Sequence, residues 1–449
     1  MNSTIEIAKF ATKLSFADLP SEVLEKVKMC VLDSIGVMIQ ASTSKIGKTI
    51  ADFIRVKGGK PDATVICSKF KAPLADASMV NGALMEIPEN QDGLRYGGIH
   101  QSSSVIPASL AMGEHMDASG RDFIAAVVLG YEVCGRIAAV THPKQTLDGF
   151  VPVGTIGPFG AAAASGKLLM LNEESMISAL GIAGFLAPIS RLESFYKTCK
   201  PLHGGQAASV GILAALLAAE GIKGSSEIIE GYCKGMVGKP NLQRVTQNLG
   251  KKYEIMETYL KPYTSCRHTH GAIEATLKLV REFDLKPSDI EDVIVKIYNA
   301  AHRIVGIRYP NVNSSFVDVQ FSIPYTVAAA ITDRAVGLDQ ISEDRIKDPR
   351  IHELAKKVKT IEDPELTKIY PDKTAAIVEI TTEQEEKHFK RIDIPKGDPR
   401  NPLTWEEIKE KFRESALHSL NNEQIMEIEH TIMNLEKLET ISELTKFLS

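Results

Sequence analysis

Cysteines are few in this chain, and none is paired with a close neighbour. The 449 residues contain no CxxC pair and no spacing typical of zinc ligands. Such isolated cysteines are typical of reduced thiols in an intracellular protein, and their spacing does not indicate a metal site. We therefore predict that none of the six forms a disulfide or binds a metal: Cys30, Cys67, Cys134, Cys199, Cys233 and Cys266.

Long hydrophobic runs and an excess of basic charge are missing as well. Charged residues such as Glu6, Lys9 and Lys13 interrupt the apolar residues near the N-terminus, and no run approaches a membrane-spanning length. A net charge of −5 argues against a general attraction to nucleic acid or to anionic membranes. We predict a cytoplasmic protein without nucleic-acid or membrane partners, in which local cations capture any anionic substrate.

The apolar periodicity changes twice along the chain, and this predicts its domains. Residues 1–265 show helical spacing rich in alanine and glycine. Residues 266–396 add alternating patterns typical of strands at Val293–Tyr298 and Ala376–Thr382, and residues 397–449 return to helical patterns. We predict a mainly α fold: a large all-helical domain in two parts, with a smaller α+β domain inserted at 266–396.

Two local signals predict where elements begin in these regions. Thr404 before Trp405-Glu-Glu is typical of a helix N-cap. The β-branched run Ala63–Cys67 favours a strand or an extended segment within the helical part.

The segment Lys200–Gly205 reads Lys-Pro-Leu-His-Gly-Gly and runs into the apolar pattern of Ala207–Ala219. Its proline and glycines predict that Lys200 and His203 lie in a turn before a helix N-terminus, where N–H groups and the helix dipole favour an anion. For this segment alone, an ordinary cap with a solvated lysine is the more common arrangement, and the other motifs of the chain decide between the two. Because lysine seldom buries its charge, we expect Lys200 to face a ligand instead of stabilising the fold.

Glu89, Asp92, Arg95 and His100 share a polar loop that also holds three glycines. An acid, a cation and an imidazole together can orient a substrate and deprotonate its carbon. A solvated loop that happens to be charged is the alternative.

The glycine-rich segment Gly149–Gly160, which includes Gly154 and Thr155, leads into a helical pattern. Its exposed N–H groups could bind an anion at the helix start. Close helix packing would use the same glycines.

A cluster of basic residues and one cysteine lies beside the predicted domain boundary, where ligand sites are common. It consists of Lys261, Cys266, Arg267, His268 and His270. The two histidines are two residues apart, which on a helix places them on different faces and disfavours a shared metal. Nothing in the sequence activates the cysteine, so a buried, inert thiol is the simpler interpretation.

Asp318 and Tyr325 flank Phe321-Ser-Ile-Pro, a pattern typical of a turn and a helix start.

Taken together, these segments resemble the MmgE/PrpD family, which includes 2-methylcitrate dehydratases, cis-aconitate decarboxylases and iminodisuccinate epimerases. The resemblance runs over essentially the whole chain and implies a discontinuous helical domain with an α+β lid, a homodimer, no metal, and an active site between the domains. It rests on six ordered motifs: Ala118-Ser-Gly-Arg-Asp, Gly149-Phe with Pro152 and Gly154-Thr155, Lys200-Pro-Leu-His-Gly-Gly, Lys261-Pro-Tyr with Cys266 and His270, Phe321-Ser-Ile-Pro-Tyr, and Lys396-Gly-Asp-Pro-Arg-Asn-Pro-Leu-Thr.

The resemblance implies that Lys200 and Lys261 line a polycarboxylate site and that His100 lies on its first loop. Two departures stand out. Glu89-Asn-Gln-Asp-Gly replaces the family's Asp-Asp-Thr-His, so that Asp92 or Glu89 is a loose counterpart of the family's acid. Val151 replaces a histidine that dehydratase and decarboxylase members usually carry.

We predict a cofactor-independent lyase for a small di- or tricarboxylate, with dehydration of a citrate-like acid ranked first. Epimerisation, isomerisation or decarboxylation of a related acid is the alternative, and a catalytically retired carboxylate-binding member is another. The predicted catalytic residues are His100, Lys200, Lys261, His203 and Asp92, with His100 or His203 as the base and the lysines stabilising an enolate. The predicted substrate-binding residues are Glu89, Arg95, Gly154, Thr155, Cys266, Arg267, His270 and Tyr325.

Overall fold

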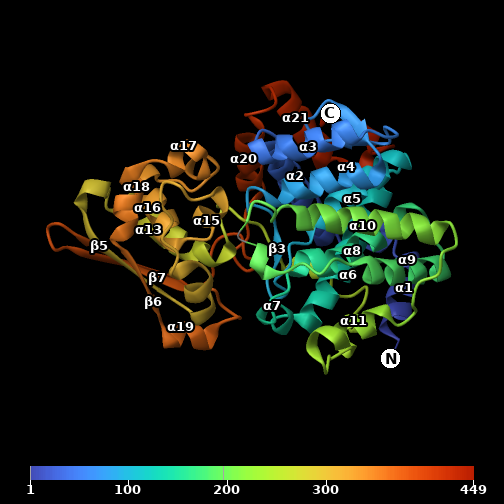
Figure 1. The fold of residues 1–449 in the computed structure, drawn as a ribbon, viewed down its shortest axis with the longest axis horizontal. Helices are drawn as coiled ribbons and strands as arrows, with labels where there is room; N and C mark the ends of the chain where they lie inside the picture. The colour runs from blue at the N-terminus through green and yellow to red at the C-terminus, as the bar shows by residue number, and fades with distance from the viewer. Residues whose placement is uncertain (1, 196) are drawn as a thin grey trace.

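Two hydrophobic cores divide the chain in the computed structural model, which describes residues 2–195 and 197–449 (Figure 1). The larger core joins buried side chains between Ile7 and Leu260 with others between Leu403 and Leu448. The smaller core is built from buried side chains between Cys266 and Ile392. Figure 1 shows the C-terminal helices, in red, returning to pack on the blue N-terminal ones, so the α+β domain interrupts the helical body.

The helical body is built around α4, α5, α6, α8 and α10, which pack against one another. The helices of the body are α1 (Ser3–Lys13), α2 (Ser21–Ser42), α3 (Lys45–Lys57), α4 (Leu74–Glu86), α5 (Ser102–His115), α6 (Gly120–Thr141), α7 (Lys144–Leu147), α8 (Pro152–Leu168), α9 (Glu173–Leu186), α10 (Leu202–Ala219), α11 (Ile228–Val237), α12 (Gln243–Thr246), α20 (Trp405–Ala416), α21 (Asn422–Met433) and α22 (Ser442–Thr445).

The body also contains two small antiparallel sheets. One pairs β1 (Ala63–Val65) with β2 (Phe70–Ala72), and the other pairs β3 (Gly93–Leu94) with β4 (Thr258–Tyr259). Of the predicted strand or extended segment Ala63–Cys67, residues Ala63–Val65 form a strand and the last two lie in the turn to β2, so the body is mainly but not entirely helical.

A four-stranded sheet with the order β6-β5-β7-β8 organises the α+β domain. Along β5 the buried residues are Ile290, Val293, Val295 and Ile297, and α13 and α16 pack on the sheet. The elements of this domain are α13 (His270–Glu282), β5 (Ile290–Ile297), α14 (Asn299–Ala301), α15 (Phe316–Gln320), α16 (Ile323–Asp333), α17 (Glu343–Ile346), α18 (Pro349–Lys356), β6 (Val358–Glu362), α19 (Pro364–Ile369), β7 (Ala376–Thr382) and β8 (Lys387–Ile392).

The mainly α fold with an inserted α+β region is confirmed. β7 has the predicted bounds, and Thr404 caps α20 by accepting a hydrogen bond from the Glu407 amide, at 3.2 Å. Strand β6 was not predicted, because only Val358 of its five residues is buried and the alternating signal is absent.

The structure corrects the interpretation of Lys200–Gly205 as a glycine turn. Helix α10 already begins at Leu202, so both glycines lie in its first turn. A Cβ at Gly204 would lie 2.6 Å from the Gly82 carbonyl oxygen, and one at Gly205 would lie 2.2 Å from that of Met79. The two glycines therefore allow α10 to pack directly against the backbone of α4.

Two helices, α6 and α10, are long and apolar enough by length and composition to cross a membrane, which differs from the expectation that no such run exists. Of the most apolar window, 89% is buried within the protein for α6 and 56% for α10. Both pack against other helices of the body, and the same composition is typical of core helices.

The contact between α10 and α4 predicts a large difference between two glycine substitutions. We expect Gly205→Ala to lower the free energy of unfolding by about 1–3 kcal/mol, because its methyl group would force the two backbones apart. Gly231→Ala in α11 is the control: no atom lies within 4 Å of the added Cβ. It should stabilise the protein by about 0.5–1 kcal/mol through helix propensity. Denaturant unfolding measures both, and equal effects would contradict the packing role of Gly205.

Candidate active site

Two lysines and two glutamates form a buried cluster where the helical body meets the α+β domain. Glu86 is the last residue of α4, and Glu89 follows in a loop with φ of +53°. Lys200 lies just before α10, and Lys261 follows β4. All four side chains are at most 2% exposed.

Glu89 is shared by both ammonium groups. Its Oε2 lies 2.5 Å from Lys200 Nζ, and its Oε1 lies 2.8 Å from Lys261 Nζ. Lys261 also donates to the Glu89 carbonyl oxygen, at 3.0 Å. Glu86 completes the cluster, because its Oε2 lies 3.1 Å from Lys200 Nζ. The cluster thus holds two cations and two carboxylates in alternation.

The burial of these charges is opposed by their mutual attraction. Burial is the largest single influence on Glu86 and would raise its pKa, but the neighbouring basic groups, Lys200 first, together outweigh it and hold this pKa at about 2. The same balance, with both lysines acting, holds the pKa of Glu89 well below its usual value. For Lys200, the two glutamates outweigh burial and raise the pKa of its ammonium group. Carboxylates of the chain thus hold Lys200 as a buried cation, which corrects the expectation that Lys200 does not bury its charge.

The loop that carries Glu89 is held from both sides. Lys411 of α20 donates to the Asn90 carbonyl oxygen at 2.9 Å and pairs with Asp33 of α2 at 2.5 Å. From the α+β domain, the Gln320 amide donates to the Ile87 carbonyl oxygen at 3.1 Å. Contacts from the helical body and from the α+β domain therefore position the cluster.

Two imidazoles border the cluster. His100 Nε2 lies 3.9 Å from Glu89 Oε1, and its Nδ1 lies 2.5 Å from the Asp92 carbonyl oxygen. That second contact is made by an N–H at Nδ1, which leaves Nε2 as the basic nitrogen facing the cluster. Burial, followed by the Lys261 charge, lowers the pKa of His100.

His203 lies in the first turn of α10, with its ring stacked on Phe195 at 5.7 Å between centroids. Burial lowers its pKa to about 4. Its Nε2 is buried and has no hydrogen-bond partner among the residues that the structure describes. His203 is therefore held as a neutral imidazole with a ring nitrogen free to meet a ligand.

The Asp92 carboxylate does not face this cluster, which corrects its predicted catalytic role. It accepts hydrogen bonds from the Tyr131 hydroxyl at 2.6 Å and the Ser102 hydroxyl at 2.7 Å. These partners lie in the interior of the helical body, where burial raises the Asp92 pKa to about 6. Asp92 contributes to the site through its backbone carbonyl group, which fixes the His100 ring.

Near the domain boundary, Cys266 and Arg267 have structural partners. Cys266 is buried, and burial raises the pKa of its thiol to about 12, so the thiol is inert as expected. Arg267 is buried against the Tyr259 ring and donates to the carbonyl oxygens of Lys396 and Pro395, at 2.8 and 3.0 Å. His270 lies beside Arg267, with Nε2 3.2 Å from the Ser265 carbonyl oxygen.

Arg95 and Tyr325 are engaged elsewhere. Arg95 pairs with Glu257 at 3.1 Å and lies 3.8 Å from Asp372 of the α+β domain. The Tyr325 hydroxyl donates to the Gln340 carbonyl oxygen within the α+β core. Of the predicted substrate-binding residues, the structure brings Glu89 directly into the cluster.

The glycine-rich segment is a packed helix and not an open anion loop. Helix α8 begins at Pro152, so Gly154 and Thr155 lie within it. A Cβ at Gly154 would lie 1.8 Å from Ser190 Oγ, and the Thr155 hydroxyl donates to the Val151 carbonyl oxygen at 3.2 Å. Val151 itself is buried and offers an apolar side chain where the resemblance implies a histidine.

Glu86 is the site residue that the sequence did not reveal. It accepts a hydrogen bond from Ser103 at 2.5 Å in addition to its pairing with Lys200. It ends an apolar helical stretch, where a glutamate is equally typical of a solvated helix end. The available signal was its position three residues before Glu89, at the start of the same loop.

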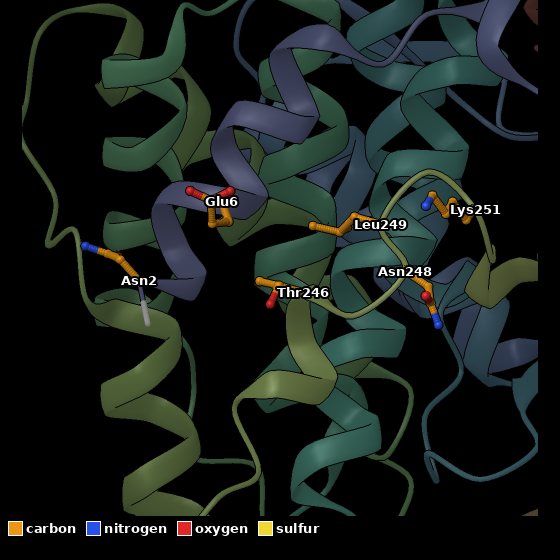
Figure 2. A pocket seen from close by; sticks show the side chains of 6 residues that line it. All are labelled: Asn2, Glu6, Thr246, Asn248, Leu249 and Lys251. Atoms are coloured by element: carbon orange, nitrogen blue, oxygen red, sulfur yellow. The ribbon is translucent and has the colours of Figure 1, made fainter.

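A surface hollow and the possible metal ligands are the other candidates for a functional site, and neither is as well suited to catalysis as the lysine cluster. A hollow of about 640 Å³ between α1 and the loop after α12, shown in Figure 2, is lined by Asn2, Glu6, Thr246, Asn248, Leu249 and Lys251. Of these, Glu6 already pairs with Lys9 at 3.2 Å. In the described parts of the chain, no group of three or more His, Cys, Asp and Glu side chains is arranged to hold a metal ion.

The fold and the cluster together define a two-domain, mainly helical protein with an ionised site at the domain boundary. Comparison with family models agrees with this class: residues 5–244 match the MmgE/PrpD N-terminal domain and residues 263–437 match the MmgE/PrpD C-terminal domain. The chain belongs to the MmgE/PrpD family.

Relatives in the family have named activities. The chain is 27% identical to a cis-aconitate decarboxylase of Aspergillus terreus (strain NIH 2624 / FGSC A1156), over 99% of this chain and 96% of the relative. It is 26% identical to the cis-aconitate decarboxylase of Homo sapiens, over 97% and 92% of the two chains. A 2-methylcitrate dehydratase of Cupriavidus necator is 24% identical over 78% and 75%.

The shared carboxylate predicts how lysine substitutions change stability. We expect Lys261→Met to lower the free energy of unfolding by about 3–5 kcal/mol, because Glu89 loses one of its two cations in a buried site. Adding Glu89→Gln should recover much of that loss, since Lys200 and Glu86 then remain as a balanced pair. Denaturant unfolding of the single and double variants measures this.

Lys278→Met is the matched control, because Lys278 pairs with Glu274 at 2.7 Å while its side chain is 50% exposed. Its effect should stay within about 0.5 kcal/mol. A double variant that is less stable than Lys261→Met alone would contradict the charge balance.

Proposed function

We propose that this protein is a lyase that acts, without a cofactor, on a small di- or tricarboxylate by forming a carbanion next to a carboxylate. The observation that carries the proposal is the Lys200–Glu89–Lys261 arrangement, in which two buried ammonium groups converge on one carboxylate. Such preorganised cations are suited to a substrate carboxylate and to the charge that develops on it as an enolate.

Substrate binding in this proposal begins with an exchange of carboxylates. When both imidazoles are neutral, the cluster has no net charge, because its two lysine cations balance its two glutamate carboxylates. A polycarboxylate therefore meets no excess of positive charge. A substrate carboxylate therefore takes the place of the Glu89 carboxylate at the two lysines. Glu89, once separated from its cations, regains the raised pKa of a buried carboxyl group and becomes a better proton acceptor.

Proton transfer then falls to Glu89 and the two histidines. His100 and His203 are held neutral in the free site, so either can accept a proton on its free ring nitrogen. Val151 supplies no acid on the α8 side. The groups that return a proton to the carbanion, or that protonate a leaving hydroxyl, are therefore His100, His203 and Glu89 in this proposal.

Decarboxylation now stands beside dehydration as the reaction to test first. The relatives named cis-aconitate decarboxylase match nearly the whole chain, whereas the relative named 2-methylcitrate dehydratase matches a smaller part. Both reactions need the same stabilised carbanion. Epimerisation or isomerisation needs it too, but without loss of a group.

A catalytically retired, carboxylate-binding protein is the second candidate. It is favoured by Val151, a buried apolar side chain that supplies no acid/base group on the α8 side. It is weakened by the two imidazoles, which a binding protein would not need beside the lysines.

The sequence also predicted a homodimer and a cytoplasmic location. We propose a homodimer, for which the exposed apolar side chains Phe185, Leu202 and Leu213 on α9 and α10 are the candidate contacts with a second copy. The cytoplasmic location stays a prediction.

Incubation of the protein with cis-aconitate, citrate, 2-methylcitrate and iminodisuccinate in D₂O separates the reactions. We expect carbon–hydrogen exchange together with either release of CO₂ or loss of water. Exchange alone would establish an isomerase or epimerase, and binding without exchange would establish the retired member. The Lys261→Met/Glu89→Gln double variant, which keeps a balanced cluster, is the inactive control.

The exchange of carboxylates predicts opposite effects of Glu89→Gln on binding and on turnover. We expect the variant to bind citrate or cis-aconitate about tenfold more tightly, because no internal carboxylate competes for the lysines. Turnover should fall, since the proton acceptor is lost. Calorimetric titration in two buffers of different ionisation enthalpy should show, in the parent protein, a proton uptake on binding that grows as the pH is lowered, because the displaced Glu89 regains a higher pKa; the uptake should be smaller in the variant.

Glu86→Gln is the matched control for this prediction, because Glu86 contacts Lys200 and not Lys261. It should leave the proton uptake of the parent protein in place. If Glu89→Gln binds with unchanged affinity and unchanged proton uptake, Glu89 is not displaced by the ligand and the proposed binding step is wrong.

A further inference from the structure

A cavity of about 900 Å³ lies between the helical body and the α+β domain, outside the lysine cluster. Its wall on the body side includes Gln40 at the end of α2 and Ile87 of the Glu89 loop. Its wall on the other side includes Phe316 of α15, Ile341 and Ile346. Protein interiors have few voids larger than a water molecule, whereas ligand pockets commonly have this size and lie at domain interfaces.

Gln40, which lines this cavity, has one buried side-chain atom that lacks a partner. Gln40 is 6% exposed, and its side-chain Oε1 has no hydrogen-bond partner among the described residues. An unsatisfied buried amide is costly, and native proteins rarely keep one without a reason. A ligand with an N–H or O–H group placed against Gln40 would satisfy it.

The charge around the cavity is weakly positive. Lys45 begins α3, directly after the Ser44 cap, and Lys347 follows α17; both line the cavity, together with the single acid Glu343. No carboxylate of the described chain pairs with either lysine, and the helix dipole of α3 adds to the positive potential. The apolar side chains in the lining favour a ligand with an apolar body over one as polar as a tricarboxylate.

We propose that this interdomain cavity is a second ligand site, which takes a small amphipathic monoanion that carries a hydrogen-bond donor. The apolar body of the ligand lies among Ile87, Phe316, Ile341 and Ile346, its donor meets Gln40, and its anion faces Lys45 and Lys347. The site is separate from the proposed active site, although Ile87 and Pro88 in its wall lie between Glu86 and Glu89. An occupant therefore bridges both domains and touches the loop that holds the lysine cluster.

The full-length protein can be tested with 8-anilinonaphthalene-1-sulfonate, which has an apolar body, one anion and one N–H donor. We expect saturable fluorescence enhancement with one probe per chain. Leu338→Trp, which fills part of the cavity wall, should weaken binding at least tenfold. Gln40→Met should weaken it about threefold or more and also raise the melting temperature, because it removes the unsatisfied amide; a purely structural residue would not combine these two effects.

Competition distinguishes the parts of the ligand, and a distant substitution controls for surface binding. Octanoate should displace the probe better than 1-octanol, and Lys45→Gln with Lys347→Gln should remove this preference. Leu147→Gln, at an exposed apolar side chain of α7 that does not line the cavity, should leave probe binding unchanged. Probe binding that does not saturate, or that is unaffected by both Leu338→Trp and Gln40→Met, would overturn the proposal, as would equal displacement by the acid and the alcohol.

Discussion

The site depends on the cost of keeping two ammonium groups away from water. A buried lysine without a partner would lose its proton or destabilise the fold by several kcal/mol, on the order of 3–5 for a broken buried pair. Glu89 prevents both outcomes by bridging Lys200 and Lys261. In the proposed function an anionic substrate takes the place of this carboxylate, so that stability of the free protein and binding of the ligand compete for one pair of cations.

Close helix packing brings the members of this cluster together. Lys200 reaches Glu86 because α10 lies directly on α4, and that approach requires Gly82, Gly204 and Gly205 at the contact. The Glu89 loop is in turn fixed by Lys411 from the C-terminal part of the chain and by Gln320 from the α+β domain. Residues far apart in sequence therefore determine the geometry of four side chains.

The sequence predicted the fold class better than the roles of single residues. Periodicity and caps identified the helices, β7 and the N-cap at Thr404, because these signals are local. Four residues selected from the sequence do lie together in the structure: Lys200, Lys261, Glu89 and His100. Their selection was possible because each lies in a recognisable motif or near glycines in a loop. The direction of a side chain could not be predicted, since it depends on tertiary contacts: Asp92 turns to Tyr131, and Gly154 lies inside α8.

The cluster of Lys200, Lys261, Glu86 and Glu89 has no net charge in the free protein, and this helps to decide between an enzyme and a binding protein. A protein that only stores or senses a polycarboxylate gains affinity from an unpaired cation, and an internal carboxylate that must first be displaced lowers that affinity. For catalysis the same displacement is useful, because binding energy is converted into a freed carboxylate beside a substrate carbon. The two neutral imidazoles, each with a ring nitrogen that can accept a proton, fit this second arrangement. The cluster is thus better explained as the resting state of an acid–base site than as a simple anion receptor.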